Sequence, residues 1–275
     1  MPLRSLLTRS SLLAVTGLLA VVAVVSAHDM FLRPTRYFVA ENAEVVVQVL
    51  NGTFSKSENS ITRDRVLDVS VVSPSGRARM DTSAWTIAGD TSTFTVRTGA
   101  AGTYVLGAST RPRMITLEGK AFNGYLKSDG IPDVLAARRR SGELEKPARE
   151  RYAKHVKAMV QVGDARAGDF GAQLGYPAEL VPMENPYTLR VGGTLRVRTL
   201  VDGQPAANQY VLYGGRTPNG ARIQQRGIRS DAQGVARIPI KRGVWFVKFI
   251  SMTRLAGDAE ADYESKWATL TYEVR

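Results

Sequence analysis

Short strand-forming segments separated by turns constrain this chain more than any other feature of its sequence. Residues 44–50 and 244–250 are rich in β-branched and aromatic side chains, and residues 91–98 alternate between polar and apolar types. Asn51-Gly52 and Asp202-Gly203 place turn-forming pairs directly behind such segments. There is no strand–helix–strand rhythm and no glycine-rich phosphate loop, so the pattern argues against a nucleotide-binding fold. We predict a mainly β protein with two immunoglobulin-like or transthyretin-like β-sandwich domains and a short helical insert.

The helical insert is predicted where the hydrophobic period changes after Gly119. One helix is expected around Phe122, and Pro132 and Gly142 bracket a second. Pro147 can open a third helix, whose buried face would consist of Tyr152, Val156, Met159 and Val160.

These patterns divide the chain into four parts. We predict a signal peptide at 1–27, an N-terminal β-sandwich at 28–163 with the helical insert at about 119–160, a linker at 164–186 and a C-terminal β-sandwich at 187–275. The linker range is rich in Gly, Ala and Pro, and strand-forming segments resume beyond it.

The first 27 residues have the composition of a secretory signal peptide. Arg4 and Arg9 precede an apolar run that ends at Val25, and the small residues Ser26 and Ala27 follow where signal peptidase cuts. The run is shorter than the ~20 residues that span a bilayer comfortably. We therefore predict cleavage after Ala27, a periplasmic location and no transmembrane segment after cleavage.

Composition excludes several kinds of chemistry. The chain has no cysteine, so it has no disulfide, no thiolate nucleophile and no cysteine-ligated metal. Its only histidines are His28 and His155, which excludes a three-histidine metal centre within one chain. The formal net charge is +12, yet no basic stripe is interleaved with stacking aromatic residues, so we predict no nucleic-acid partner. The candidate nucleophiles Ser251, Thr253 and Ser265 have no identified base beside them, and we expect a protein that is not an enzyme.

Cleavage after Ala27 would make His28 the first residue and would give it two nitrogen ligands. Its α-amine and its imidazole can chelate one metal ion once both are deprotonated. His155 is the sole second imidazole, and it is expected at the edge of the buried stripe of the third helix. Asp29 could be a ligand, a hydrogen-bond acceptor for the imidazole, or simply a charge. The predicted metal site is therefore His28, Asp29 and His155, for a divalent transition metal (Ni, Co or Cu).

Four carboxylates that alternate along residues 257–266 form a second polar cluster: Asp258, Glu260, Asp262 and Glu264. Converging carboxylates could bind a hard cation, but their spacing matches no calcium loop. The pattern favours a solvated acidic loop over a cation site.

Several short motifs carry a resemblance to a known family. They are the run from Ala27 to Pro34 after the predicted signal peptide, Phe122 to Leu126, Arg149 to Lys154, Val160 to Gly163, Val181 to Tyr187 and Tyr263 to Thr269. With these motifs the chain resembles, over nearly all of residues 27–275, an exported bacterial family of unknown function. Members of that family are often labelled as periplasmic components of cobalt or nickel uptake, and they are similar to other exported β-sandwich proteins that aid metal import.

The resemblance implies roles for particular residues. His28 and Asp29 match the pair that follows the signal peptide in the family. The family commonly has a histidine in the segment that corresponds to residues 249–252, where this chain has Ser251 instead. His155 falls where the family often carries other residues, so the comparison adds nothing to its predicted role.

We accordingly predict a periplasmic transition-metal-binding protein that is an accessory or substrate-binding component of metal uptake, with a membrane metal transporter as partner. One alternative is a histidine-brace copper oxidase that acts on polysaccharide, which would need His155 beside His28 and an exposed aromatic face. Another is a non-catalytic binding or scaffold module of the envelope, because such sandwiches carry many unrelated functions.

Overall fold

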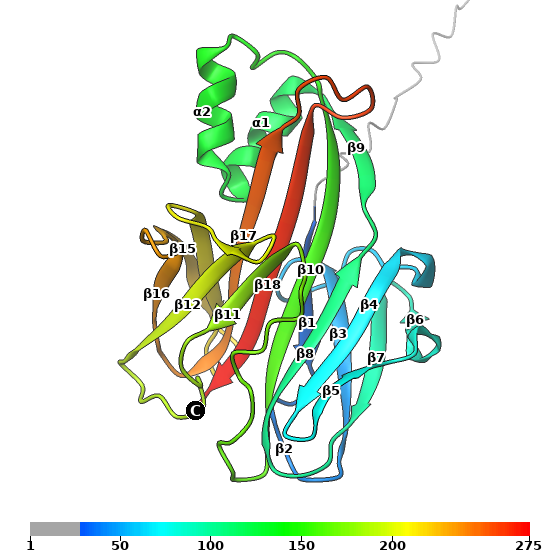
Figure 1. The fold of residues 1–275 in the computed structure, drawn as a ribbon, viewed down its shortest axis with the longest axis vertical. Coiled ribbons are helices and arrows are strands. Elements are labelled where there is room, and N and C mark those ends of the chain that lie inside the picture. The colour runs from blue at the N-terminus through cyan, green and yellow to red at the C-terminus, as the bar shows by residue number, and fades with distance from the viewer. Residues whose placement is uncertain (1–27) are drawn as a thin grey trace, which may run out of the picture.

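The computed structural model describes residues 28–275, so the predicted signal peptide at 1–27 lies outside the described residues. The described chain is mainly β, as predicted, and it forms three sheets and two α-helices (Figure 1). The first half contains β1 (Asp29–Pro34), β2 (Phe38–Val39), β3 (Glu44–Gly52), β4 (Val66–Ser73), β5 (Gly76–Arg79), β6 (Thr86–Ala88), β7 (Thr91–Arg97), β8 (Gly102–Thr110), β9 (Arg113–Leu117), α1 (Gly119–Ser128) and α2 (Pro132–Arg140).

Beyond α2 the described residues form strands alone, and the first of these strands pairs with β2, β8 and β9 of the first half. They are β10 (Ala148–Val162), β11 (Ala178–Pro182), β12 (Thr194–Val201), β13 (Gln204–Pro205), β14 (Tyr210–Arg216), β15 (Arg222–Arg229), β16 (Val235–Pro239), β17 (Gly243–Arg254) and β18 (Tyr263–Val274).

One large sheet runs through both halves of the molecule. Its strand order is β15-β14-β17-β18-β10-β8-β4-β5, and β10 and β18 lie side by side at its centre (Figure 1). These two strands pair in parallel from Glu150 opposite Tyr263 to Ala158 opposite Thr271. The two halves therefore share one continuous sheet and are not joined through a linker alone. The predicted linker at 164–186 itself contains β11, which pairs with β12.

Two smaller sheets complete a separate core on each half. The sheet β1-β3-β7-β6 contributes Val47 and Phe94 to a core that the central sheet closes with Val156 and Leu106. The sheet that contains β11, β12, β13 and β16 contributes residues such as Leu195 to a second core on the other half. Burial of these apolar faces, at about 25 cal/mol per Å², is the main force that holds the layers together.

The third predicted helix is wrong, because Ala148–Val162 is the long strand β10. Residues 154–162 are all buried, since β10 lies between two neighbouring strands and is covered on both faces. A strand that is buried on both faces loses the alternation of polar and apolar residues by which strands are recognised in a sequence. The apolar residues at helical spacing therefore lie on both faces of the sheet: Val156 belongs to one core and Met159 to the other.

The first two predicted helices are confirmed as α1 and α2. Pro132 begins α2, where its missing N–H costs nothing. Phe122 and Leu126 on α1 are fully buried and pack against Trp267 of the central sheet. The helices thus cover one end of β17 and β18 (Figure 1).

A buried ion pair fastens the segment before β11 to the central strand. The ammonium group of Lys157 on β10 contacts the Glu179 carboxylate and donates to the carbonyl of Ala172 at 2.9 Å. The same carboxylate accepts from the backbone N–H groups of Leu174, Gly175 and Tyr176 at 2.8–3.0 Å. Both side chains are at most 3% exposed, so these hydrogen bonds replace water completely.

We expect Glu179→Ala to lower the free energy of unfolding by about 3–5 kcal/mol, because it leaves a buried ammonium group and buried N–H groups without partners. The matched control is Glu184→Ala, which removes a partly exposed ion pair with Arg196 and should cost about 1 kcal/mol or less. Urea unfolding followed by circular dichroism measures both. Equal losses in the two variants would contradict this account.

Candidate functional site

His28 lies directly before β1, and β1 is held on two sides. At its edge it pairs with β3, with Asp29 opposite Gly52. On one face, the hydroxyl groups of Thr269 and Thr271 on β18 donate to the carbonyl groups of Met30 and Leu32 at 2.8 and 2.6 Å. The backbone that leads to His28 is therefore fixed by hydrogen bonds on its edge and on its face.

The imidazole of His28 is oriented by a carboxylate. Its Nε2 lies 2.5 Å from Oε2 of Glu58, and the side chains of His28 and Glu58 are 21% and 42% exposed. Within residues 28–275 the other ring nitrogen, Nδ1, makes no hydrogen bond. A carboxylate on Nε2 favours the tautomer that carries its proton there, and this leaves the lone pair of Nδ1 free for a ligand.

A buried lysine holds the carbonyl group of His28. Lys154 on β10 donates to this carbonyl oxygen and, at 2.9 Å, to Oδ1 of Asn51. Its ammonium group also lies 5.2 Å from the ring centre of Trp267, a cation–π contact. Burial lowers the pKa of Lys154 to about 8. The first described residue is thus fixed by its ring and by its backbone.

Asp29 faces away from the His28 ring and enters an ion-pair cluster. Nζ of Lys248 on β17 lies 2.5 Å from Oδ2 of Asp29 and 2.9 Å from Oδ1 of Asp129, at the end of α1. Burial raises the pKa of Asp29. Burial alone would lower the pKa of Lys248, but the carboxylates of Asp29 and Asp129 raise it. The cluster connects β1, β17 and α1. The carboxylate that contacts the His28 ring belongs to Glu58 and not to Asp29.

His155 lies on the opposite face of the central sheet from His28. Successive side chains of a strand point to opposite faces, so Lys154 faces His28 while His155 faces Ser109 and Tyr176. Its Nδ1 is 2.8 Å from Oγ of Ser109, and Nε2 is buried without a partner among the described residues. The structure does not bring the two histidines together, in contrast to the prediction of a shared ion. The reason is that residue 155 belongs to a strand and not to a helix.

The acidic residues after β17, the second group of candidate ligands, are engaged in ion pairs. Within residues 28–275 no three side chains of His, Asp or Glu come together as a metal site. The carboxylates after β17 form ion pairs with β10: Asp258 with Arg151 at 3.0 Å and Asp262 with Arg149 at 2.9 Å. Backbone N–H groups and Arg151 lower the pKa of Asp258 to about 2. The acidic segment thus fastens a loop to the sheet.

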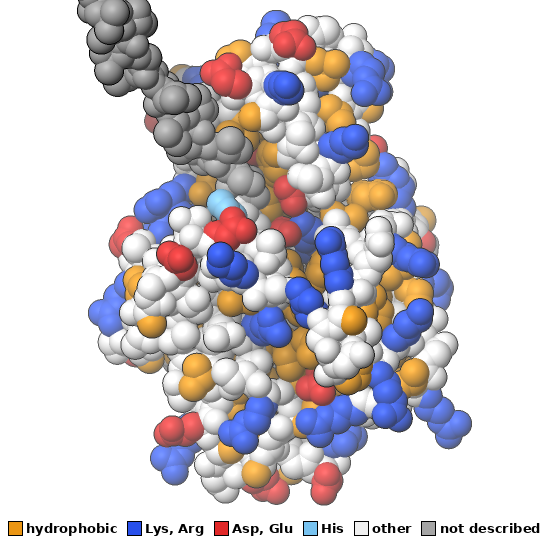
Figure 2. All heavy atoms as spheres, turned by 180° about the vertical axis from the view of Figure 1, so that it is seen from behind, with side chains coloured by type: hydrophobic (Ala, Val, Ile, Leu, Met, Phe, Trp, Pro, Cys, Tyr) orange, Lys and Arg blue, Asp and Glu red, His pale blue; other side chains and the backbone are white. Residues whose placement is uncertain are grey.

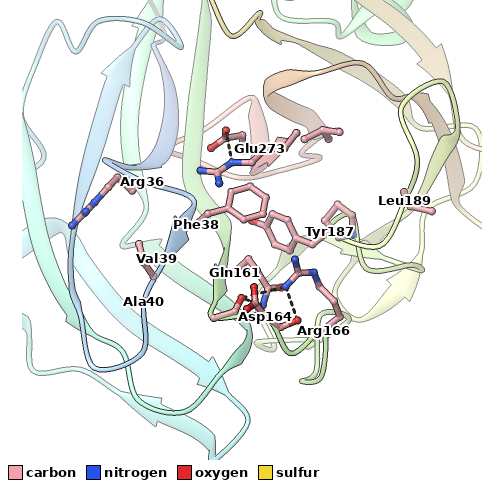
Figure 3. Close-up of a pocket in the computed structure, with 14 residues that line it drawn as sticks. Arg36, Phe38, Val39, Ala40, Gln161, Asp164, Arg166, Tyr187, Leu189 and Glu273 are labelled. Carbon is pink, nitrogen blue, oxygen red and sulfur yellow. Dashed lines mark hydrogen bonds and ion pairs between the residues drawn. The ribbon is translucent and has the colours of Figure 1, made fainter.

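A cavity of about 500 Å³ lies at the opposite end of the sandwich from α1 and α2 (Figure 3). Phe38 and Tyr187 face each other across it with ring centres 5.0 Å apart. Its cations have local partners: Arg275 lies over Phe38 and contacts Glu273, and Arg166 donates to backbone carbonyl groups. None of the predicted site residues lines this cavity.

No helix within the described residues 28–275 is long and apolar enough to cross a membrane.

Three residues of the His28 site were missed by the sequence interpretation. Lys248 does carry a signal, because it interrupts the strand-forming run 244–250, and a buried lysine needs a partner. Lys154 carries none, because its segment has the pattern of a helix, in which a lysine is ordinary. Glu58 lies in a polar loop and has no distinguishing pattern. Only the pairing of β1 with β3 brings it to His28.

Comparisons with known proteins give one family match. Residues 25–253 match the sequence model of the family described as "Domain of unknown function (DUF4198)". No curated protein matches the chain. Among solved structures, a tetra-tandem repeat from the extending region of a large adhesion protein is similar at 13% identity and a TM-score of 0.24, covering 90% of this chain and 50% of that chain. The adhesin InvE of Yersinia pseudotuberculosis is similar at 11% identity and a TM-score of 0.21, covering 90% of this chain and 59% of that one. The chain therefore spans about half the length of these adhesion-protein chains.

Burial lowers the pKa of His155 to about 4, from about 6.5 in an unfolded chain. The unfolded state therefore binds one more proton than the native state between these two values, and stability falls as pH drops through that range. We expect wild-type protein to lose about 2 kcal/mol more of its unfolding free energy between pH 7 and pH 4.5 than His155→Gln does. Urea unfolding at a series of pH values gives this difference. Parallel curves for the two proteins would show that His155 is not buried in its neutral form.

Proposed function

The chain belongs to the DUF4198 family, and from the geometry around His28 we propose that it is a periplasmic protein that binds a divalent transition metal through its processed N-terminus. In this proposal it is an accessory or substrate-binding component of Ni or Co uptake, or of Cu handling, and it delivers the ion to a membrane metal transporter. The proposal needs cleavage after Ala27, so that His28 carries a free α-amino group.

The contact between Glu58 and Nε2 of His28 is the observation that carries this proposal. A ligating histidine usually donates its second ring N–H to a carboxylate, which fixes the ring and raises its basicity. With Nε2 occupied, Nδ1 is the nitrogen left for a metal. In a processed chain, Nδ1 and the α-amine of the same residue would close a chelate ring on one ion.

The hydrogen bond from Lys154 supports the same site. It fixes the carbonyl oxygen of His28, which is only two bonds beyond the Cα atom that carries the α-amine. A neighbouring cation disfavours protonation of an amine but also repels a divalent ion, so the support comes from the fixed backbone and not from the charge.

A two-nitrogen chelate leaves several coordination positions open, which suits a protein that passes an ion on. Nitrogen ligands accept Ni, Co and Cu, and affinity alone favours Cu among these. His155 and Asp29 take no part in the chelate that we propose. The copper-oxidase alternative loses support, because it needs a second imidazole at His28. We propose a binding role and no catalysis.

We infer also that each half is an immunoglobulin-like or transthyretin-like sandwich that shares the central sheet with the other. In this arrangement β1 belongs to the first sandwich and lies on β18 of the second, so the metal site stands where the two meet.

The decisive experiment compares the processed protein with a variant that carries one additional Gly before His28. Mass spectrometry first confirms the N-terminal residue of exported protein, and calorimetry then follows titration with Ni²⁺, Co²⁺ and Cu²⁺. The extended variant should lose most of its affinity, because its α-amine is displaced from the imidazole. Equal affinity in both proteins would eliminate the terminal site.

Glu58→Gln should weaken metal binding by about 10- to 100-fold, the range seen when the partner of a ligating histidine is removed. His155→Gln is the matched control and should bind as wild type does, because that ring lies on the other face of the sheet. A loss in His155→Gln with none in Glu58→Gln would contradict this assignment.

A further inference from the structure

A second cavity, of about 300 Å³, lies between the two halves beside the N-terminal part of β1. Its floor is a cluster of three aromatic rings from separate strands and loops: Phe31, Phe54 and Phe246. Their ring centres are 5.0–5.3 Å apart, and the interplanar angles of 53–76° are those of tilted and edge-to-face contacts. A rigid apolar surface thus lies at the bottom of a cavity that polar residues border.

Two arginines without carboxylate partners border one end of this cavity. Arg216 on β14 donates to Oγ of Ser55 and to the carbonyl of Gly220, and Arg222 pairs with it across the β14–β15 ladder. Among the described residues neither guanidinium has a carboxylate within 4 Å, since neither forms an ion pair. Figure 2 shows basic side chains at the border of the hollow between the two halves. This end of the cavity thus offers guanidinium N–H donors that no carboxylate within residues 28–275 engages.

The other end of the cavity is acidic. Asp29 lines it, and Asp29 shares the ammonium group of Lys248 with Asp129. Lys154 lies close enough to balance the charge of the second carboxylate, but Oδ1 of Asp29 accepts no hydrogen bond within residues 28–275 and so remains for a further donor. The acidic end is therefore suited to an ammonium group brought by a ligand.

Strand β17 gives the spacing between the two ends. Lys248, Phe246 and Val244 follow one another at two-residue steps on the same face, and Val244 lies opposite Arg216. Four residues of strand span about 13 Å at ~3.3 Å per residue. The acid, the aromatic floor and the arginines thus follow one another in a line along β17.

We propose that this cavity binds a short apolar peptide, two or three residues long, as a zwitterion. Its α-ammonium group lies toward Asp29, its apolar side chain rests on the three phenylalanine rings, and its terminal carboxylate meets Arg216 and Arg222. A tripeptide spans at most about 10 Å, and a hydrogen bond of about 3 Å at its ends extends this reach to the ~13 Å line of groups. This proposal does not depend on metal binding at His28.

Calorimetry with the tripeptide Ala-Phe-Ala, on processed protein with a metal chelator present, tests the proposal. The free tripeptide should bind, and its N-acetylated and C-amidated forms should each bind about ten-fold more weakly, since each lacks one charge-assisted hydrogen bond. Absence of binding by the free tripeptide overturns the proposal. Equal binding of the free and N-acetylated forms also overturns it, because the site would then be one for simple organic anions.

A pair of variants on β15 locates the carboxylate end. Arg222→Gln should prefer the free over the amidated tripeptide less strongly than wild type does, because one of the two arginines that meet the carboxylate is removed. Arg226→Gln is the matched control: Arg226 is exposed on the same strand but pairs with Tyr213 and does not line the cavity. Thermal unfolding confirms that both variants are folded. The same effect in both variants would show that the net basic charge, and not the cavity, attracts the peptide.

The variant with an additional Gly before His28 separates this proposal from the proposed function. It should bind Ala-Phe-Ala with unchanged affinity even though its metal affinity falls. A parallel loss of peptide binding in that variant would overturn the claim that the two sites are independent.

Discussion

The parallel pairing of β10 with β18 is the contact on which the rest of the molecule depends. It joins strands from the two halves into one sheet, and each face of that sheet closes a different core. Because side chains alternate along a strand, neighbouring residues of β10 are directed to different cores. Lys154 reaches the first described residue, while His155 and Lys157 enter the polar contacts on the other side. The alternation along β10 thus determines which side chains come into contact on each face of the sheet.

The buried charges follow from this arrangement. A charged group inside a protein is costly unless it is paired or hydrogen-bonded, and each buried lysine of the central sheet satisfies that condition in its own way. Lys154 bonds to a carbonyl and an amide oxygen, Lys157 meets one carboxylate, and Lys248 meets two. All three fasten a segment that belongs to another layer. The three lysines therefore hold different layers together, and one of them, Lys154, also fixes the backbone of His28.

Sequence reasoning predicted the class of fold and the first two helices, because turn residues and alternating segments depend on local physics. It failed for β10, because a strand covered on both faces has the continuous burial that helices also show. That single error placed His155 beside His28. The partner of the His28 ring, Glu58, could not be found from local pattern at all, since its position is set by strand pairing between residues 30 positions apart. The role of His28 stays a prediction, because it depends on cleavage after Ala27.

The docking of β1 onto β18 has a consequence for how the protein matures. Hydroxyl groups that hold the carbonyl groups of Met30 and Leu32 come from residues 239 positions later in the chain. Contacts of such separation form late, because a long loop must close before they are gained. During synthesis the beginning of the chain emerges first and has to wait for nearly all of the remainder before β1 can dock. The metal site that we propose would therefore stay incomplete on any truncated or stalled polypeptide, so only finished molecules would compete for scarce ions.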